Sequence, residues 1–191
     1  MILNHLWAKY TQNANDWQHL HVNHESLFYC TAHILLVGFI PFICSYFAAV
    51  YLGWTITNGT DVQLLPMDAL ILSTFTYLLM VGGVFALALI AWRLALHYQA
   101  YPSFSHTLEL STYATTPIFI LGFCALYPQP WFILATGICA TSYCAYLLHN
   151  GIHIVIHMEA HQKKRYTIAL LACGAILFMS VFSTILWLYS P

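Results

Sequence analysis

Four regularly spaced histidines in HNGIHIVIHMEAHQKKR, residues 149–165, suggest metal-binding chemistry. Each stands four residues after the last, and we call the set the histidine ladder: His149, His153, His157 and His161. On a helix, such neighbours share one face about 6 Å apart along the axis, so an adjacent pair can chelate one ion. On a strand they would be about 13 Å apart and could not. All four span about 18 Å of helix and cannot share one ion.

A second group of possible ligands lies near the start of the chain, in HLHVNHE. It contains His19, His21, His24 and Glu25. Together with the ladder, these side chains could complete a tetrahedral Zn²⁺ site or accept Ni²⁺ or Cu²⁺, because imidazole suits all three metals. Two other interpretations stay open: a solvated polar face whose histidines meet lipid headgroups, and a response to pH, because histidine titrates near neutrality.

The composition predicts which kind of protein carries these histidines. Charged residues are 6% of the chain and hydrophobic residues 61%, against about 25% and 45 to 50% in soluble domains. The chain is therefore expected to be an integral membrane protein. Its 191 residues leave room for one compact bundle. The net charge of -1 argues against nucleic acid as a partner, and leaves the lipid bilayer as the main surroundings.

Five apolar runs are long enough to cross a hydrocarbon layer as helices of about 20 residues. They cover approximately 27–53, 68–97, 111–127, 131–150 and 167–189. Pro128 and Pro130 force a tight turn, so the third and fourth spans are expected to form a hairpin. The sequence thus predicts an all-α bundle of five transmembrane helices in a membrane domain of residues 27–190. A partly amphipathic N-terminal segment, residues 1–26, precedes it.

The basic residues predict the orientation, because lysine and arginine concentrate on the cytoplasmic side. With a cytoplasmic N-terminus, Lys9, Arg93 and the Lys163–Arg165 cluster all fall inside. The loop of residues 54–67 contains no lysine or arginine and belongs outside. The sequence therefore predicts an N-in, C-out bundle, in which ten of the eleven histidines lie on the cytoplasmic side or at its membrane boundary. His33 lies about two turns into the first span.

Buried polar residues cluster in STYATTPIF, residues 111–119. Pro117 has no N–H, so the carbonyl of Tyr113 loses its helical partner. In lipid it must be satisfied by another donor, such as Thr115, Thr116 or a neighbouring helix. The segment is either a packing kink or a hinge beside a polar pocket. That pocket would face the next span at Thr141, Ser142 and Tyr143.

The acidic residues and motifs argue against two classes of function. Asp68 and Glu109 are expected at span ends, with no charged residue near a midplane, which lowers the odds of an ion-coupled pump. There is no glycine-rich phosphate loop, GxSxG elbow or HExxH motif. Enzymatic activity is therefore not expected.

Glycines have two expected roles. Five of them should let helices approach closely: Gly82, Gly83, Gly122, Gly137 and Gly174. Another, Gly151, is expected to cap the fourth span and to start a separate interfacial helix that turns Ile152, Val155 and Ile156 toward lipid.

Six stretches occur in the order and spacing of a known family. They are HLW (5–7), TAHILL (31–36), GW (53–54), YPSFSH (101–106), YATTPIFILGFCALYP (113–128) and YLLHNGI (146–152). In them the chain resembles bacterial inner-membrane members of the Yip (Ypt/Rab-interacting protein) domain family. The family's mark in the third span is a tyrosine followed four residues later by a proline, and Tyr113 and Pro117 match it. The resemblance covers about residues 4–152 and weakens toward the fifth span.

This resemblance implies a five-helix bundle in the bacterial inner membrane with a cytoplasmic N-terminus. Eukaryotic members are trafficking and membrane-organising partners of Rab GTPases, but a bacterium has no Rab system to match. His33 and His106 have counterparts in the family pattern, whereas the histidine ladder departs from it.

Two functions remain open from the sequence. The first is a non-enzymatic, oligomeric membrane scaffold that recruits a cytoplasmic protein partner through residues 1–26 and the His-rich loop 149–165. The second is a small transporter or channel, for example for a divalent metal ion, with the histidines as its cytoplasmic binding station.

Overall fold

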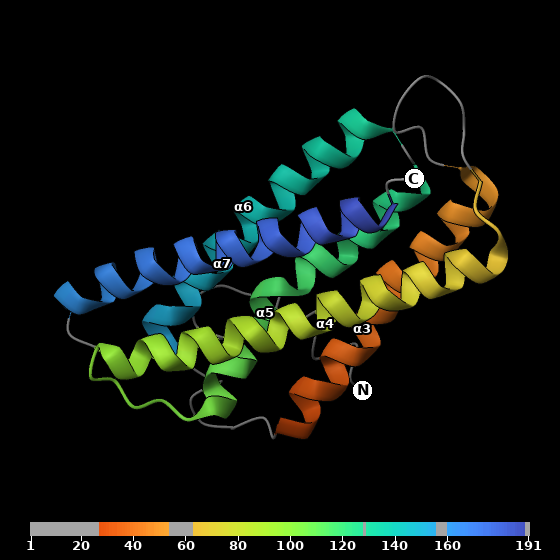
Figure 1. Ribbon diagram of the computed structural model, residues 1–191. Helices are drawn as coiled ribbons and strands as arrows, with labels where there is room; N and C mark the ends of the chain where they lie inside the picture. The colour runs from red at the N-terminus through yellow and green to blue at the C-terminus, as the bar shows by residue number, and fades with distance from the viewer. Residues whose placement is uncertain (1–26, 54–62, 128, 156–159, 190–191) are drawn as a thin grey trace, which may run out of the picture.

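Five long helices form one bundle in the computed structural model, which describes residues 27–53, 63–127, 129–155 and 160–189 (Figure 1). α3 (Leu27–Phe47) continues into the π-helical turn η1 (Ala48–Leu52), and α4 covers Pro66–His97. α5 (Phe104–Ile120) continues into the 3₁₀ turn η2 (Leu121–Leu126). α6 (Pro130–Val155) and α7 (Ala160–Tyr189) complete the fold. The N-terminal segment, residues 1–26, lies outside the described residues.

The expected five spans are confirmed as helices long and apolar enough to cross a membrane. Large apolar side chains remain exposed around the bundle, among them Phe28, Leu78, Ile138 and Ile176. Such a surface is unfavourable in water and suits hydrocarbon.

Local sequence explains where several helices begin and end. Pro66 stands at the first position of α4 and Pro130 opens α6, positions at which a missing N–H costs nothing. α4 ends in a Schellman motif around Gln99, whose φ of 59° is left-handed. The Ala100 N–H donates to the Ala95 carbonyl and the Gln99 N–H to the Leu96 carbonyl, as this motif requires. Ala100 is buried, so the motif turns the chain back into the core.

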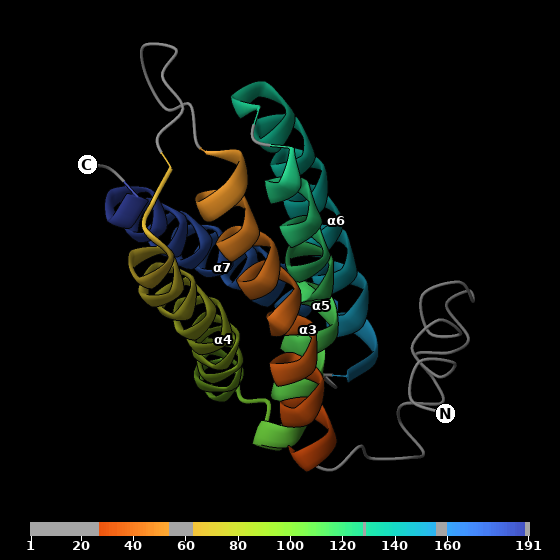
Figure 2. The same cartoon turned by 90° about the vertical axis from the view of Figure 1, so that its right-hand side faces the viewer.

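α5 is the central helix of the bundle. It packs against α3, α4 and α6, whereas α7 packs along α4 and more sparsely against α6. A quarter turn of the molecule shows α5 behind α3, with α4 and α6 on its two sides (Figure 2). α5 is also the least apolar and most enclosed of the five spans. The fold therefore places its most polar helix where lipid cannot reach most of its side chains.

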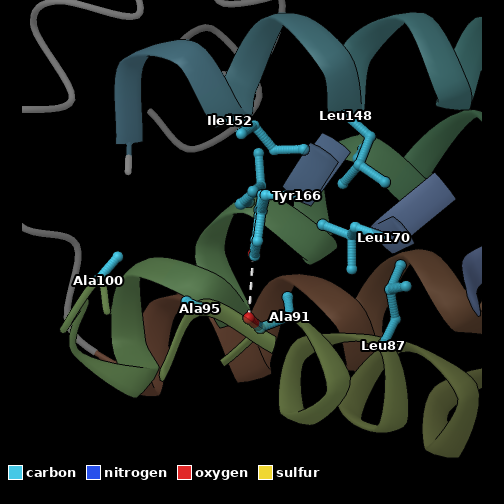
Figure 3. Close-up of a cluster of buried hydrophobic side chains, with 10 residues drawn as sticks. Leu87, Ala91, Ala95, Ala100, Leu148, Ile152, Tyr166 and Leu170 are labelled. Atoms are coloured by element: carbon cyan, nitrogen blue, oxygen red, sulfur yellow. Dashed lines mark hydrogen bonds between the residues drawn. The ribbon is translucent and has the colours of Figure 1, made fainter. Parts of the chain in front are cut away.

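Two apolar clusters meet at α5. One joins α4 to the facing ends of α6 and α7 through Leu87, Ala91, Ala95, Ala100, Leu110, Ala114, Leu148, Ile152, Tyr166 and Leu170. The other joins α3, α4 and α5 through Cys30, Ile34, Val81, Val84, Ala88, Leu108 and Phe119. Tyr166 lies at the centre of the first cluster, where its hydroxyl donates to the Ala91 carbonyl at 3.0 Å (Figure 3). This bond fastens the start of α7 to α4.

Two expectations about helix ends are wrong. The third span begins at Phe104 rather than near residue 111, because tertiary packing shields its polar first turns. Gly151 does not end the fourth span, since α6 continues through it to Val155. Ile152 is fully buried in the cluster around Tyr166 rather than turned toward lipid, because α7 covers this end of α6.

Of the five glycines expected to allow close helix approach, Gly122 does so most strongly. A Cβ built on it would lie 2.6 Å from Cα of Pro41 and 2.8 Å from its nitrogen. Backbone therefore meets backbone where η2 crosses α3. Gly83 and Gly174 face side chains at ordinary contact distance, but Gly82 and Gly137 have no described atom within 4 Å of the added carbon. For those two positions the expectation is wrong.

Candidate functional site

The buried polar side chains of α5 form the candidate site. Residues 107–114 are buried without a break. The polar side chains of this stretch are those of Thr107, Glu109, Ser111, Thr112 and Tyr113, and the buried Thr116 follows just after it. A buried polar group is costly in a membrane unless it is hydrogen-bonded. The partners of these groups therefore determine what the site can do.

Threonine hydroxyls on α5 mostly bond to their own helix. Thr112 donates to the Leu108 carbonyl at 2.7 Å, Thr115 to the Ser111 carbonyl at 2.7 Å, and Thr116 to the Thr112 carbonyl at 2.8 Å. Such bonds back to residue i−4 satisfy the hydroxyl and often bend a helix. Thr115 and Thr116 thus do not donate to the Tyr113 carbonyl. The expected rescue of that carbonyl by the two threonines does not occur.

The interhelical contact at this site comes from His33 on α3. Its Nε2 lies 3.2 Å from Oγ1 of Thr116, and its ring centroid lies 5.6 Å from that of Tyr113 at a tilt of 44°. The structure thus brings together three of the residues singled out from the sequence. They come from positions about 80 residues apart, so only the folded bundle joins them.

Two proline-bearing helices run side by side along this contact. Pro117 lies inside α5 and Pro41 inside α3. Each proline removes one N–H from its helix ladder. Farther along the same two helices, where α5 continues into η2, Gly122 lies against the backbone of Pro41. The hinge segment Tyr113–Pro117 is therefore packed against α3 over its polar face.

The expected polar pocket against α6 is not formed. Ser142 and Tyr143 are exposed on the outer side of α6, and the Thr141 hydroxyl donates to the Gly137 carbonyl at 2.8 Å. The α6 surface that packs on α5 is carried by other positions, including Cys144, whose thiol contacts the Ile118 backbone. The orientation of α6 about its own axis therefore directs the side chains of Ser142 and Tyr143 away from the Pro117 segment.

Glu109 is the functional candidate that the sequence interpretation missed. It was expected at a span end, but α5 begins at Phe104 and the Glu109 side chain is 6% exposed. Asp68, by contrast, is exposed in the first turn of α4, as expected. The spacing of His106, Glu109, Tyr113 and Thr116, three, four and three residues apart, was the signal that these side chains share one helix face.

The histidine ladder is divided between two helices. His149 and His153 belong to α6, and His161 belongs to α7. The side chain of His149 is exposed. His157 lies outside the described residues, as do His19, His21 and His24. Within the described ranges, no group of three or more histidine, cysteine, aspartate or glutamate side chains could hold a metal ion.

Comparison with known proteins places this bundle in a family. The Yip1 domain model matches residues 10–182, a range that contains α3 to α6 and most of α7. The chain belongs to the Yip1 domain family. The Tyr113–Pro117 pair and the His33 contact are therefore features of a Yip1 domain in this protein. No solved structure matches the chain at a significant level.

Two curated relatives support the same placement. The chain is 28% identical to the inner membrane protein YohC of Escherichia coli K12 over 190 residues, 98% of this chain and 97% of the relative. It shows the same identity and coverage with YohC of Escherichia coli O6:H1 strain CFT073. This Yip1-family chain is a multi-pass protein of the bacterial inner membrane.

Proposed function

We propose that this Yip1-family protein is a non-enzymatic scaffold of the inner membrane, which organises the membrane or recruits partners. The observation that carries the proposal is the closed packing of α5: residues 107–114 are all buried, and the threonine hydroxyls bond to helix backbone or to His33. A helix whose threonine hydroxyls are committed in this way supports a solid bundle better than a water-filled path. Partners would then bind to the outer surface of the bundle and to the termini of the chain.

The proposed orientation is N-in and C-out. It is supported by Lys164 and Arg165, which are exposed at the start of α7, and by Arg93, which is exposed near the end of α4. These ends of α4 and α7 are joined by the Tyr166–Ala91 hydrogen bond, so the basic side chains gather at one membrane boundary. In this orientation residues 1–26 and the loop before α7 both face the cytoplasm, where a second copy or a protein partner would bind.

A complex-mapping experiment tests the scaffold. Native membranes would be crosslinked and solubilised, and the protein's complexes separated by native electrophoresis. We expect a discrete complex that is lost when residues 1–26 are removed and is retained in Pro117→Ala. A monomer in every condition, with wild-type protein folded, would contradict the proposal.

A transporter or channel is the second candidate, because Glu109 is a buried carboxyl within a span, and such groups often mark ion pathways. Flux of protons and divalent cations into proteoliposomes distinguishes the two functions. The scaffold predicts rates equal to those of empty vesicles. Flux that depends on Glu109 or Thr116 would instead establish transport.

Divalent metal binding by the histidine ladder, as Zn²⁺, Ni²⁺ or Cu²⁺, is a separate proposal. It is supported by His149 and His153 standing four residues apart on one continuous helix, α6. Elemental analysis of protein purified without a histidine tag tests it. Stoichiometric metal that is lost in the His153→Ala, His157→Ala double variant is expected. Substoichiometric metal that these changes leave unaltered would exclude the ladder as a site.

A further inference from the structure

Three basic side chains are exposed where the end of α4 meets the start of α7, and we call them the basic rim: Arg93, Lys164 and Arg165. The Tyr166 hydroxyl donates to the Ala91 carbonyl at 3.0 Å, so the first turns of α7 lie beside the last turns of α4 (Figure 1). Tyr166 follows Arg165 directly, and Arg93 comes shortly after Ala91. The bundle therefore gathers these three cations at one membrane boundary.

The basic rim borders directly on apolar surface that faces lipid. Leu89 precedes Arg93 by one turn of α4, and Ile168 follows Lys164 by one turn of α7, so each pair shares a helix face. Both apolar side chains are exposed, at 51% and 59%, as are the two cations. Side chains one turn apart on a helix are separated by about 6 Å along its axis. The cations therefore lie at the depth of lipid headgroups, with acyl chains against the apolar residues beside them.

Arg93 is held at this boundary by aromatic rings. Its guanidinium carbon lies 5.4 Å from the ring centroid of Trp92. The Trp92 ring packs edge-on against Phe104, the first residue of α5, with the two centroids 6.5 Å apart. Trp92 is half-buried, so the stack fixes the cation at the surface of the bundle. A guanidinium carries its N–H donors in a planar fork, which suits the two unesterified oxygens of a phosphodiester.

Among the described residues, no carboxylate is exposed beside the basic rim. Asp68 and Glu109 are the acidic residues of the described ranges. Asp68 lies in the first turn of α4, at the opposite end of that helix, and Glu109 is buried. Glu159, just before α7, and Lys163 add one charge of each sign, so together they leave the net charge of this region unchanged. The rim is therefore positive in a chain whose net charge is -1.

We propose that the basic rim binds the headgroups of anionic phospholipids. The cations contact lipid phosphates, while the acyl chains lie against Leu89 and Ile168. Phosphatidylethanolamine also carries a phosphate, but its ammonium needs a carboxylate partner, and no described carboxylate is exposed at the rim. Phosphatidylglycerol carries no such cation, so charge complementarity favours it and related anionic lipids. The protein thus collects anionic lipid around the joined ends of α4 and α7.

Native mass spectrometry of the full-length protein in detergent tests the rim, with equal amounts of phosphatidylglycerol and phosphatidylethanolamine that have the same acyl chains. Detergent removes any effect of membrane orientation. We expect the wild type to retain phosphatidylglycerol preferentially. Arg93→Gln should weaken this binding about fivefold, and the Lys164→Gln, Arg165→Gln double variant about twentyfold. Arg93→Lys keeps the charge and should keep most of the binding, whereas Lys9→Gln removes the same charge outside the rim and should bind as wild type.

Thermal denaturation in nanodiscs gives a second measurement. The Tm of the wild type should be higher in phosphatidylglycerol than in zwitterionic phosphatidylcholine, and this difference should shrink in the double variant and at high salt but remain in Lys9→Gln. No preference for phosphatidylglycerol in the wild type, or an equal loss of it in Lys9→Gln and in the double variant, would overturn the proposal. Equal stabilisation by inorganic phosphate in detergent without lipid would indicate a site for free anions and would also overturn it.

Discussion

At the scale of single residues, two adjacent threonines of α5 have different roles. The Thr116 hydroxyl accepts from His33 while it donates to its own helix. The Thr115 hydroxyl donates to the carbonyls of Ser111 and Thr112. The hydroxyl at 116 therefore links two helices, whereas the hydrogen bonds that the hydroxyl at 115 donates remain within one helix.

Replacement of each threonine by valine, which has nearly the same shape, should separate these roles. Thr116→Val leaves the His33 Nε2–H without its acceptor, so we expect a loss of about 1 to 3 kcal/mol in the free energy of unfolding. Thr115→Val removes only bonds within the helix and should cost less than about 1 kcal/mol. Thermal denaturation in detergent measures both. A larger loss at position 115 would contradict the assignment of the interhelical bond.

Gln99 offers a stabilising substitution. Its φ of 59° is unfavourable for a residue with a Cβ and free for glycine. Gln99→Gly should therefore stabilise the protein by up to about 1 kcal/mol. Gln162→Gly, in the first turn of α7, should instead destabilise the protein, by up to about 1 kcal/mol. Opposite shifts of Tm are expected, and a fall of Tm in both variants would argue against the Schellman motif.

At the scale of helices, the crossing of α3 and η2 depends on the absence of a side chain at Gly122. Gly122→Ala would place a methyl group 2.6 Å from Cα of Pro41, and backbone cannot move aside as a flexible side chain can. We expect a loss of about 1 to 3 kcal/mol or more. Gly82→Ala, which meets no described atom within 4 Å, should be neutral or stabilising. Equal changes in unfolding free energy for the two variants, measured in detergent, would contradict the close backbone contact between Gly122 and Pro41.

One buried hydroxyl adds a hydrogen bond to the apolar packing between the start of α7 and α4. Tyr166→Phe removes the 3.0 Å hydrogen bond to the Ala91 carbonyl but keeps the ring packed on Tyr98. The expected loss is about 0.5 to 1.5 kcal/mol. Tyr101→Phe, at a side chain that is 82% exposed, is the control and should change little. Hydrogen exchange should also speed up in the first turns of α7 in Tyr166→Phe alone.

The helices could be predicted from the sequence better than their contacts. Spans were recognisable because lipid requires long apolar runs, but polar residues such as His106 and Glu109 concealed the true start of α5 at Phe104. The His33–Thr116 contact joins residues 83 positions apart, and no local periodicity reports which face of α3 meets α5. Gly151 resembled a helix cap, yet α7 packing buries Ile152 and the helix continues.

At the scale of the whole molecule, the fold separates two kinds of surface. Apolar side chains cover the outside of the spans, whereas the charged residues Arg93, Lys164 and Arg165 are exposed near the joined ends of α4 and α7. A bundle with these three basic residues at one end has a preferred orientation in a membrane with a cytoplasmic side. The proposed orientation should therefore depend on very few side chains.

Reporter fusions test this orientation. With the N-terminus inside and the C-terminus outside, green fluorescent protein should fluoresce when fused to the N-terminus, and alkaline phosphatase should be active when fused to the C-terminus. Replacement of Lys163, Lys164 and Arg165 by glutamine removes three of the five basic residues of the chain. It should lower phosphatase activity relative to protein amount, because the bias that holds the loop before α7 inside is weakened. Arg93→Gln, which removes one exposed charge, should have a smaller effect. Phosphatase that is inactive at the C-terminus of the wild type would reverse the orientation, and with it the side of the membrane on which partners bind.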